Sequence, residues 1–258
     1  MADARSHYDR KLGPIYAWMV GPFEDASAAS DRVFAELDLG SKSADAIPTD
    51  RRADAPRVAI DLGCGHGVQS IALARRGYRV IAVDFCEQLL RELAARAAEL
   101  PIVAVRADLR DTARYLPDRI DAAVCMGDTL THLPSQEGVD QLLRDVTEVL
   151  APGGVVVLGF RDYVTAPLRD DARFIPVRSD PDRILTCFLE YGERTVRVHD
   201  LVHSRRESGF ELSVGSYEKL RLDPRSVAAQ LVAAGLTIEL DRTERGFVML
   251  AARRPIAR

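Results

Sequence analysis

Hydrophobic and polar positions divide the chain into stretches with different periods. Between residues 6 and 38, apolar side chains recur at roughly helical spacing, and Gly21-Pro22 separates two helical segments. Residues 39–57 are polar, contain prolines and show no period, which predicts a linker or a long surface loop. We therefore expect residues 1–56 to form an N-terminal helical cap and its linker.

Residues 57–160 alternate short apolar runs with helical patterns. The expected strands cover 58–63, 78–84, 102–108, 122–127 and 155–160. The expected helices cover 68–76, 87–99 and a stretch that is capped by Ser135 and ends at Pro152-Gly153-Gly154. Apolar strands separated by helices predict a parallel sheet covered on both faces. We expect a doubly wound α/β core that binds its ligand at the carboxyl ends of the first strands.

The pattern changes after Phe160. Three β-rich stretches follow with short turns and no helix between them, at 184–191, 195–206 and 209–222. They predict an antiparallel β lid, inserted over residues 161–222 above the ligand end of the sheet. Residues 223–258 return to the core, with a helix from the Asp223 cap to Gly235 and a hairpin of strands 236–240 and 246–252.

The composition fits one large domain with an appended cap. The 258 residues are 47% hydrophobic and 29% charged, with a net charge of -4. Aromatic residues make up only 6%, so a stacking platform for nucleic acid has few side chains to build on. The mild acidity also argues against a surface that follows phosphates. We expect no nucleic-acid partner.

The cysteines and the N-terminus bear on the compartment. Cys64, Cys86, Cys125 and Cys187 lie far apart, without the spacing of a disulfide framework or a zinc site. The N-terminus is charged and leads into no apolar signal segment, and no run of about 18 apolar residues occurs. We expect a cytoplasmic protein that does not span a membrane.

One glycine-rich turn carries the clearest chemical signal. Residues 61–67, D-L-G-C-G-H-G, join a predicted strand to a helix. Glycines permit a tight turn and the close approach of a ligand, and the start of a helix offers unpaired N–H groups. A bland strand-to-helix turn explains a lone glycine motif about equally well.

Acids at the next two strand ends strengthen the ligand interpretation. Asp84 ends the second strand, where a carboxylate can accept both hydroxyls of a ribose, and Phe85 can lie against a base. Asp108 and Leu109 end the third strand, where a carboxylate and a backbone N–H can bind the edge of a base. Each acid alone could be a helix cap. Together, at one edge of the sheet, they predict a nucleoside-like ligand.

The turn differs from that of a nicotinamide cofactor site. Its G-x-G-x-G spacing misplaces the glycine that packs the helix against the strand in G-x-G-x-x-G. Asp61 would repel a pyrophosphate, whereas a ligand with an amino-acid ammonium would tolerate or use this carboxylate, directly or through loop geometry. The chain contains no G-x-x-x-x-G-K-[ST] segment, which excludes P-loop chemistry.

The motifs D-L-G-C-G-H-G, V-D-F, A-D-L, C-M-G-D and L-A-P-G-G, in this order and spacing, resemble those of the class I S-adenosylmethionine-dependent methyltransferases. The resemblance covers roughly residues 57–160 and implies a seven-stranded Rossmann-like sheet with a reversed last strand, which the C-terminal hairpin fits. It implies S-adenosyl-L-methionine as cofactor, with its methionine part on the glycine turn, its ribose on the acid after strand two and its adenine on the A-D-L segment. The cofactor-binding residues that it implies are Gly63, Cys64, Gly65, Asp84, Phe85, Asp108, Leu109, Met126 and Gly127.

Three further features are similar to small-molecule N-methyltransferases, of the glycine N-methyltransferase and amino-sugar dimethyltransferase types. They are the pair Tyr8-Asp9 in the N-terminal helical segment, the His132-Leu133 end of the loop after the fourth strand, and the antiparallel insertion. This resemblance implies a small-molecule methyl acceptor, methylated at nitrogen, with oxygen as the other candidate.

His132 and Tyr8 are the catalytic candidates. His132 lies on the loop that faces the methyl donor, and an ordinary imidazole pKa would suit it to deprotonate an amine or a phenol. A histidine that caps the next helix or merely lines the pocket is an equally good interpretation. Tyr8 is the better placed tyrosine for closing over donor and acceptor, whereas Tyr16 is expected to be a core aromatic. Alignment alone can supply much of the catalysis of such an in-line displacement.

Three other polar residues stay ambiguous. His199 and His203 share one face of a predicted strand and are expected to face solvent. No third ligand accompanies them, so no metal site is expected. Asp128 could contact the donor's ammonium or the acceptor, or could be a loop carboxylate.

The expected function is S-adenosylmethionine-dependent methyl transfer to a small-molecule acceptor. An NAD-dependent oxidoreductase and a non-catalytic S-adenosylmethionine-binding module are the alternatives. A homodimer is compatible with the sequence.

Overall fold

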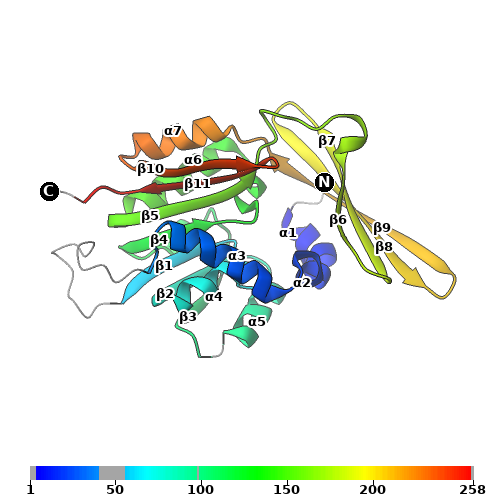
Figure 1. The fold of residues 1–258 in the computed structure, drawn as a ribbon, viewed down its shortest axis with the longest axis horizontal. Helices are drawn as coiled ribbons and strands as arrows, with labels where there is room; N and C mark the ends of the chain where they lie inside the picture. The colour runs from blue at the N-terminus through cyan, green and yellow to red at the C-terminus, as the bar shows by residue number, and fades with distance from the viewer. Residues whose placement is uncertain (1–3, 41–55, 98, 257–258) are drawn as a thin grey trace.

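Two sheets organise the protein. The computed structural model describes residues 4–40, 56–97 and 99–256 (Figure 1). A seven-stranded sheet forms the larger body, and a four-stranded sheet projects from one end of it. The first helices of the chain, α1 (Ala4–His7) and α2 (Tyr16–Val20), lie between the two sheets (Figure 1).

The larger sheet has the strand order β10-β11-β5-β4-β1-β2-β3. Its parallel strands are β1 (Arg57–Leu62), β2 (Tyr78–Asp84), β3 (Ile102–Arg106), β4 (Ile120–Cys125) and β5 (Leu150–Arg161). β11 (Phe247–Arg253) runs antiparallel to β5 and pairs with β10 (Thr237–Glu244) as a hairpin. The predicted doubly wound sheet with a reversed last strand is confirmed.

Helices cover both faces of this sheet (Figure 1). One face carries α3 (Phe23–Glu36), α4 (Val68–Arg75) and α5 (Glu87–Arg96), and the other carries α6 (Gln136–Glu148) and α7 (Pro224–Ala233). Successive residues of a strand point to opposite faces, so in β1 Ala59 packs in the cluster with Phe34, and Ile60 packs in the cluster with Leu142. Both faces of the central strands are therefore buried, as their continuous apolar runs predict, whereas the edge strand β3 stays partly exposed, with Val103 at 44%. Among the described residues, none of the helices is long and apolar enough to cross a membrane.

The strand order creates the place for a ligand. Chain order reverses between β1 and β4, because β2 and β3 follow on one side of β1 while β4 and β5 lie on the other. Loops at the carboxyl ends of strands on either side of such a point leave a crevice between them.

The N-terminal helical segment is built from short turns. After α1 come a π-helical turn (Tyr8–Leu12), a 3₁₀ turn (Gly13–Ile15) and α2. Gly21 adopts a φ of 95° and separates α2 from α3, as predicted. We call residues 4–22 the cap. Most of the predicted linker, residues 41–55, lies outside the described residues.

The smaller sheet is an antiparallel meander of order β6-β7-β8-β9, which we call the lid sheet. Its strands are β6 (Phe174–Ser179), β7 (Arg183–Tyr191), β8 (Thr195–Arg206) and β9 (Gly209–Leu220). The last three were predicted, whereas β6, which contains Pro176, was not. Proline is tolerated here because β6 is an edge strand, with a register break after Pro176.

One predicted boundary is wrong. Pro152-Gly153-Gly154 was expected to end a helix, but α6 already ends at Glu148, and β5 begins at Leu150. The pairing of β4 with β5 shifts register after Ile120, and the Gly153 amide donates to the carbonyl of Arg254. The glycines therefore lie within an irregular start of the strand.

Candidate active site

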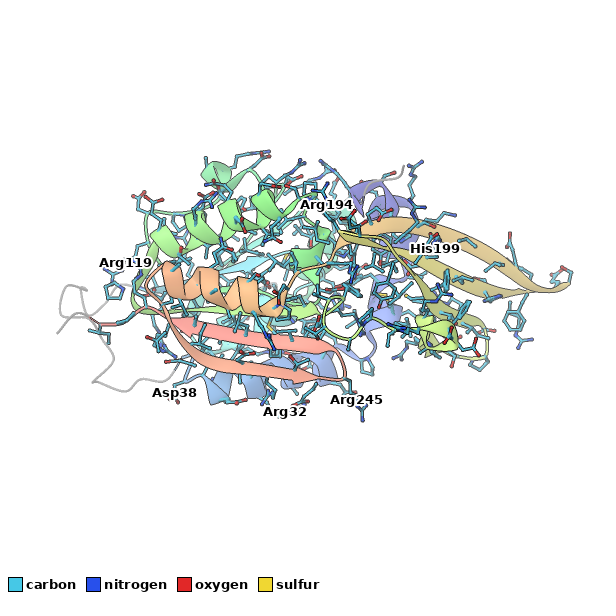
Figure 2. All side chains as sticks on the ribbon, turned by 90° about the horizontal axis from the view of Figure 1, so that it is seen from above. Arg32, Asp38, Arg119, Arg194, His199 and Arg245 are labelled. Atoms are coloured by element: carbon cyan, nitrogen blue, oxygen red, sulfur yellow. The ribbon has the colours of Figure 1, made fainter. Side chains whose placement is uncertain are left out.

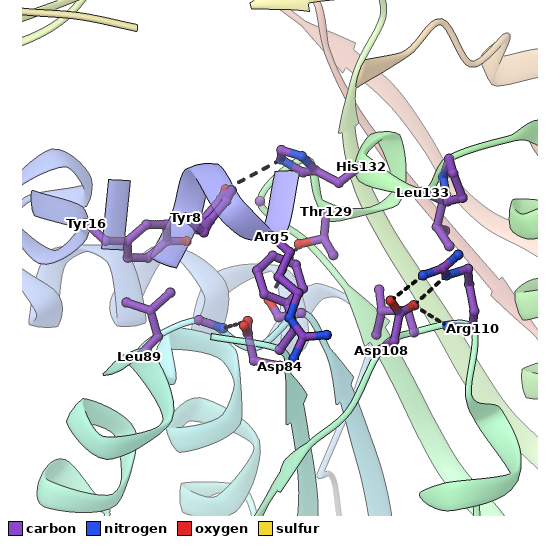
Figure 3. A pocket seen from close by; sticks show the side chains of 16 residues that line it. Arg5, Tyr8, Tyr16, Asp84, Leu89, Asp108, Arg110, Thr129, His132 and Leu133 are labelled. Carbon is purple, nitrogen blue, oxygen red and sulfur yellow. Dashed lines mark hydrogen bonds and ion pairs between the residues drawn. The ribbon is translucent and has the colours of Figure 1, made fainter. Parts of the chain in front are cut away.

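A cavity of about 250 Å³ lies at the carboxyl ends of the central strands (Figure 3). We call it the main cavity. The cap, the strand ends and the loop after β4 line it with Arg5, Tyr8, Tyr16, Gly63, Gly65, Asp84, Phe85, Leu89, Asp108, Leu109, Arg110, Gly127, Thr129, His132, Leu133 and Pro134.

The glycine turn forms one wall of the main cavity. Gly63 and Gly65 have φ values of 73° and 52°, in the left-handed region that favours glycine. A Cβ atom on Gly63 would lie 2.2 Å from Cγ2 of Thr129. The bare backbone thus lets the loop after β4 approach the turn closely.

Asp84 holds the turn in place. Its Oδ2 accepts the Gly65 amide at 2.9 Å, and its Oδ1 accepts the Cys86 amide at 2.8 Å. Burial raises the pKa of Asp84, and these amide hydrogen bonds oppose the shift. Each carboxylate oxygen can accept a second hydrogen bond, so Asp84 retains the capacity to bind two hydroxyls.

Asp108 lines the main cavity after the end of β3, where it forms an ion pair with Arg110. The guanidinium donates to Oδ1 at 2.9 Å and to Oδ2 at 2.8 Å (Figure 3). This pairing holds the pKa of Asp108 below its ordinary value. Leu109 beside it lines the cavity as well. The predicted adenine-binding role of this segment stays a prediction, in which Arg110 shares the carboxylate.

Seven of the nine predicted cofactor-binding residues line the main cavity, and Cys64 and Met126 are the other two. Cys64 is buried in a cluster with Ile71 and Leu93. Met126 packs against the core cluster that contains Val157. Both side chains therefore pack with hydrophobic core residues and do not line the main cavity.

Asp61 stabilises the connection between β1 and α4 on either side of the glycine turn. It is buried, and its Oδ2 accepts the Ser70 hydroxyl of α4 at 2.6 Å. Burial raises the pKa of Asp61 to about 7, against the hydrogen bond from Ser70. This bond ties the end of β1 to the helix that follows the turn.

His132 and Tyr8 meet at the wall of the main cavity. The Tyr8 hydroxyl makes a long hydrogen bond of 3.5 Å to Nε2 of His132, and the rings pack edge to face (Figure 3). Nδ1 of His132 is buried and has no hydrogen-bond partner among the described residues. Burial, assisted by the Lys219 ammonium, lowers the pKa of His132 to about 3. The expectation of an ordinary imidazole pKa is therefore wrong, and the ring is neutral at pH 7.

Tyr16 was expected to be a core aromatic, but it also lines the main cavity. Its ring packs edge to face on His66 and lies about 3.2 Å from the position of a Cβ on Gly65. Burial raises the pKa of its hydroxyl well above the ordinary value. Tyr16 thus closes the cavity over the glycine turn.

Asp128 is a loop carboxylate that fastens the lid sheet. It accepts hydrogen bonds from Lys219 Nζ at 2.5 Å, Tyr163 Oη at 3.1 Å and the Arg161 amide at 2.9 Å. Burial opposes its ionisation, but the Lys219 ammonium and the amide outweigh it and lower the pKa of Asp128. These contacts occupy the carboxylate, which favours the interpretation of Asp128 as a loop carboxylate.

His199 lies on the outer face of the lid sheet, which Figure 2 shows projecting from the core. Its Nε2 is 3.2 Å from Oε2 of Glu190, and its Nδ1 is 2.8 Å from Oγ of Ser216. His203 follows on the same face of β8. The two histidines were expected to face solvent, and the His199 side chain on this outer face is 23% exposed.

Several residues near the site were missed at the level of the sequence. They are Thr129, which lines the main cavity, and the surrounding residues His7, Asp200, Tyr217 and Lys219. A signal was present for one of them: Asp200 interrupts the apolar face of β8 that Val196, Val198 and Val202 form. A polar residue in such a register predicts a buried partner.

Comparisons with known proteins agree with this geometry. Residues 59–154 match a family model described as a methyltransferase domain. The chain is 33% identical over 189 residues to the cypemycin N-terminal methyltransferase of a Streptomyces species, covering 67% of this chain and 76% of that protein. It is 32% identical over 119 residues to the glycine/sarcosine N-methyltransferase of Aphanothece halophytica, covering 45% of this chain and 44% of that protein.

A solved structure extends the likeness in fold to nearly the whole chain. The S-adenosylmethionine-bound amino pentose methyltransferase from Micromonospora echinaspora superposes with a TM-score of 0.65 at 19% identity, covering 95% of this chain and 97% of that one. These matches favour neither the oxidoreductase nor the non-catalytic alternative. The strand order, the glycine turn with Asp84 and the similarity to the cypemycin enzyme show that the chain belongs to the S-adenosylmethionine-dependent methyltransferases.

Proposed function

We propose that this enzyme methylates a nitrogen of a small molecule, with Tyr8 and His132 on the acceptor side of the main cavity. S-adenosylmethionine supplies, when bound, a methyl group activated on a sulfonium. The residues of the cavity fit this group: Gly63 and Gly65 leave bare backbone, and Asp84 can accept two further hydrogen bonds. We assign the methionine part to the glycine turn and the ribose to Asp84.

The weak basicity of His132, together with the nitrogen acceptors in the names of similar proteins, supports the assignment to nitrogen. A base whose pKa is about 3 is a poor acceptor for the proton of a hydroxyl. An unprotonated amine presents its lone pair and needs no base before it attacks, whereas an alkylammonium has to lose its proton to solvent before it can react. His132 and Tyr8 then serve to orient the amine in line with the methyl group, which is where much of the rate enhancement of such a displacement originates.

The enclosure of the site supports a small acceptor. Tyr8 and Tyr16 of the cap line the main cavity. Tyr217 of the lid sheet does not line it but stacks on the ring of His132. Two names of similar proteins point to nitrogen acceptors, namely glycine or sarcosine and the N-terminus of cypemycin, and a third names an amino pentose as the acceptor. An amine at the end of a larger molecule therefore belongs among the acceptors to be tested.

The test is an acceptor screen with the purified protein. Small primary and secondary amines, amino sugars and short peptides with free N-termini are each paired with the matching hydroxyl compound. Formation of S-adenosylhomocysteine and of the methylated product is followed by mass spectrometry. Methylation of amines alone supports the proposal, and methylation of hydroxyl compounds alone contradicts it.

We further propose that the enzyme is a homodimer joined through the outer face of the lid sheet. This face carries large apolar side chains that are 39–49% exposed, namely Phe174 (49%), Ile184 (39%), Phe210 (48%), Leu212 (49%) and Val214 (49%). The outer faces of two copies can pack against each other about a two-fold axis, which buries these apolar side chains. A twin charge substitution, Leu212→Glu with Val214→Glu, should convert a dimer to a monomer in light scattering. A wild-type monomer would exclude the dimer.

The compartment is a separate proposal. Cys64, Cys86, Cys125 and Cys187 are all free in the structure. Free cysteines are typical of a reducing compartment, and we propose the cytoplasm.

A further inference from the structure

A buried polar pair joins the cap to the lid sheet. Nε2 of His7 lies 2.8 Å from Oδ2 of Asp200, and the two side chains are only 2% and 5% exposed. The Cys187 thiol donates to the other oxygen, Oδ1, at 3.0 Å. A buried carboxylate is costly to leave unpaired, so a contact between residues 193 positions apart is expected to be specific.

The lid sheet provides a recess for the His7 ring. Gly215 of β9 stands opposite Asp200 of β8 in the register of the sheet. A Cβ on Gly215 would lie 2.3 Å from Cε1 of His7, so any side chain at this position would displace the ring. Gly215 is not in the left-handed region, and space rather than backbone conformation therefore accounts for a glycine here.

From His7, ring contacts lead to the main cavity. The His7 ring packs on Tyr217 with a centroid distance of 4.5 Å, and Tyr217 stacks on His132 at 5.4 Å with an interplanar angle of 20°. His132 itself lines the main cavity. Asp200, His7, Tyr217 and His132 thus form a continuous series of contacts from the lid sheet to the site.

The orientation of His132 depends on this series. Its hydrogen bond to Tyr8 is long, at 3.5 Å, and within the part of the chain that the structure describes its Nδ1 has no hydrogen-bond partner. The ring is therefore held in place mainly by packing, between the edge contact with Tyr8 and the stack on Tyr217. A displacement of Tyr217 would be passed on to His132.

We propose that His7 and Asp200 are positioning residues for methyl transfer. Asp200 fixes His7 in the Gly215 recess, His7 holds Tyr217, and Tyr217 holds His132 at the acceptor side of the main cavity. The contact between the cap and the lid sheet and the alignment of His132 then depend on the same residues. The role in turnover rests on the proposed function of His132, whereas the structural link does not.

Two variants break the series at different points. Asp200→Leu removes the carboxylate that holds His7, and Gly215→Ala expels the His7 ring while leaving Asp200 intact. Asp200→Asn is the conservative variant, because its amide oxygen can still accept from an imidazole N–H. The matched control is His199→Asn, which changes the neighbouring residue of β8 on the outer face, where His199 contacts Glu190.

The first readout needs no acceptor. The ring signals of His132 are followed by NMR in protein labelled at its histidines, with His132→Ala providing the assignment and S-adenosylhomocysteine added to fill the donor site. We expect the His132 signals to shift in Asp200→Leu and in Gly215→Ala, and to stay unchanged in His199→Asn. Unchanged His132 signals in both folded variants would overturn the proposal, whatever the acceptor is.

The second readout is turnover with an amine found in the screen. A misplacement of the order of an ångström lowers turnover by about 10²-fold, and this is the loss of kcat expected for both variants. Asp200→Asn should recover most of it, and the affinity for S-adenosylhomocysteine should stay within about twofold throughout, since other strand ends make the donor contacts. A wild-type kcat in Asp200→Leu would overturn the positioning role. Absence of any amine substrate for the wild-type enzyme would refute the proposed function and leave the NMR result standing.

Discussion

The ammonium of Lys219, on β9 of the lid sheet, lies 2.5 Å from the carboxylate of Asp128, in the loop after β4. Both side chains are buried, at 11% and 7% exposed. Asp128 holds a left-handed backbone conformation, with a φ of 72°, beside the main cavity. This ion pair is therefore a direct connection between the lid sheet and the loop that carries Thr129 and His132.

Breaking this ion pair should destabilise the protein strongly. Lys219→Met leaves the Asp128 carboxylate buried without its cation, which costs about 3–5 kcal/mol. The free energy of unfolding in urea measures the loss. Lys11→Met is the matched control, because Lys11 is an exposed lysine that also contacts the lid sheet, at Ser213. The double variant Lys219→Met with Asp128→Asn should lose less than the sum of the single changes. Simple additivity would mean that the pair contributes nothing as a pair.

Asp84 should be required for binding of the donor. Asp84→Asn keeps the shape of the side chain but loses one acceptor oxygen and the negative charge. We expect the affinity for S-adenosylhomocysteine to fall by about 10- to 100-fold, the value of one or two hydrogen bonds to a charged group. Calorimetry measures this, with Glu87→Gln, an exposed acid at the start of α5, as control. Wild-type affinity in a folded Asp84→Asn protein would place the ribose elsewhere.

Gly63 should tolerate no side chain, for two separable reasons. Its left-handed backbone makes alanine unfavourable by about 1–2 kcal/mol, and the added Cβ would also collide with Thr129. Gly77→Ala is the matched control, because Gly77 has a φ of 85° and none of the described residues comes within 4 Å of the added atom.

We expect both alanine variants to lose stability in thermal unfolding and only Gly63→Ala to lose binding of S-adenosylhomocysteine. Equal binding by the two variants would show that the close approach of Thr129 to the glycine turn does not matter for the donor.

His132 should lower the free energy of unfolding of the protein as the pH falls. Its pKa is about 3 when folded, because of burial and Lys219, and about 6.5 in an unfolded chain. Between these values the unfolded chain binds a proton that the folded protein excludes, so stability falls as the pH falls. His66, whose pKa burial lowers to about 4, acts in the same direction.

Urea unfolding between pH 4 and pH 7 tests this expectation. His132→Asn should unfold with about one fewer proton taken up than the wild type, which appears as a flatter dependence of stability on pH. Parallel curves for the two proteins would mean that His132 titrates normally in the folded state.

The sequence by itself determined the sheet and the donor side of the site. The apolar runs of β1 to β5 and the helices between them impose parallel strands, whose carboxyl ends meet at one edge. The glycine turn, Asp84 and Asp108 each follow directly from a strand end, so chain order alone brings them together. These features depend on neighbours in sequence, which a pattern of side chains records.

The acceptor side was decided only by the tertiary structure. His132 could not be distinguished from an ordinary titrating histidine, because its pKa depends on burial and on Lys219 of β9. The partners of Asp128 and His7 likewise come from the lid sheet, at Lys219 and Asp200. Desolvation and pairing are set by groups that are close in space and far apart along the chain, and no local periodicity encodes them.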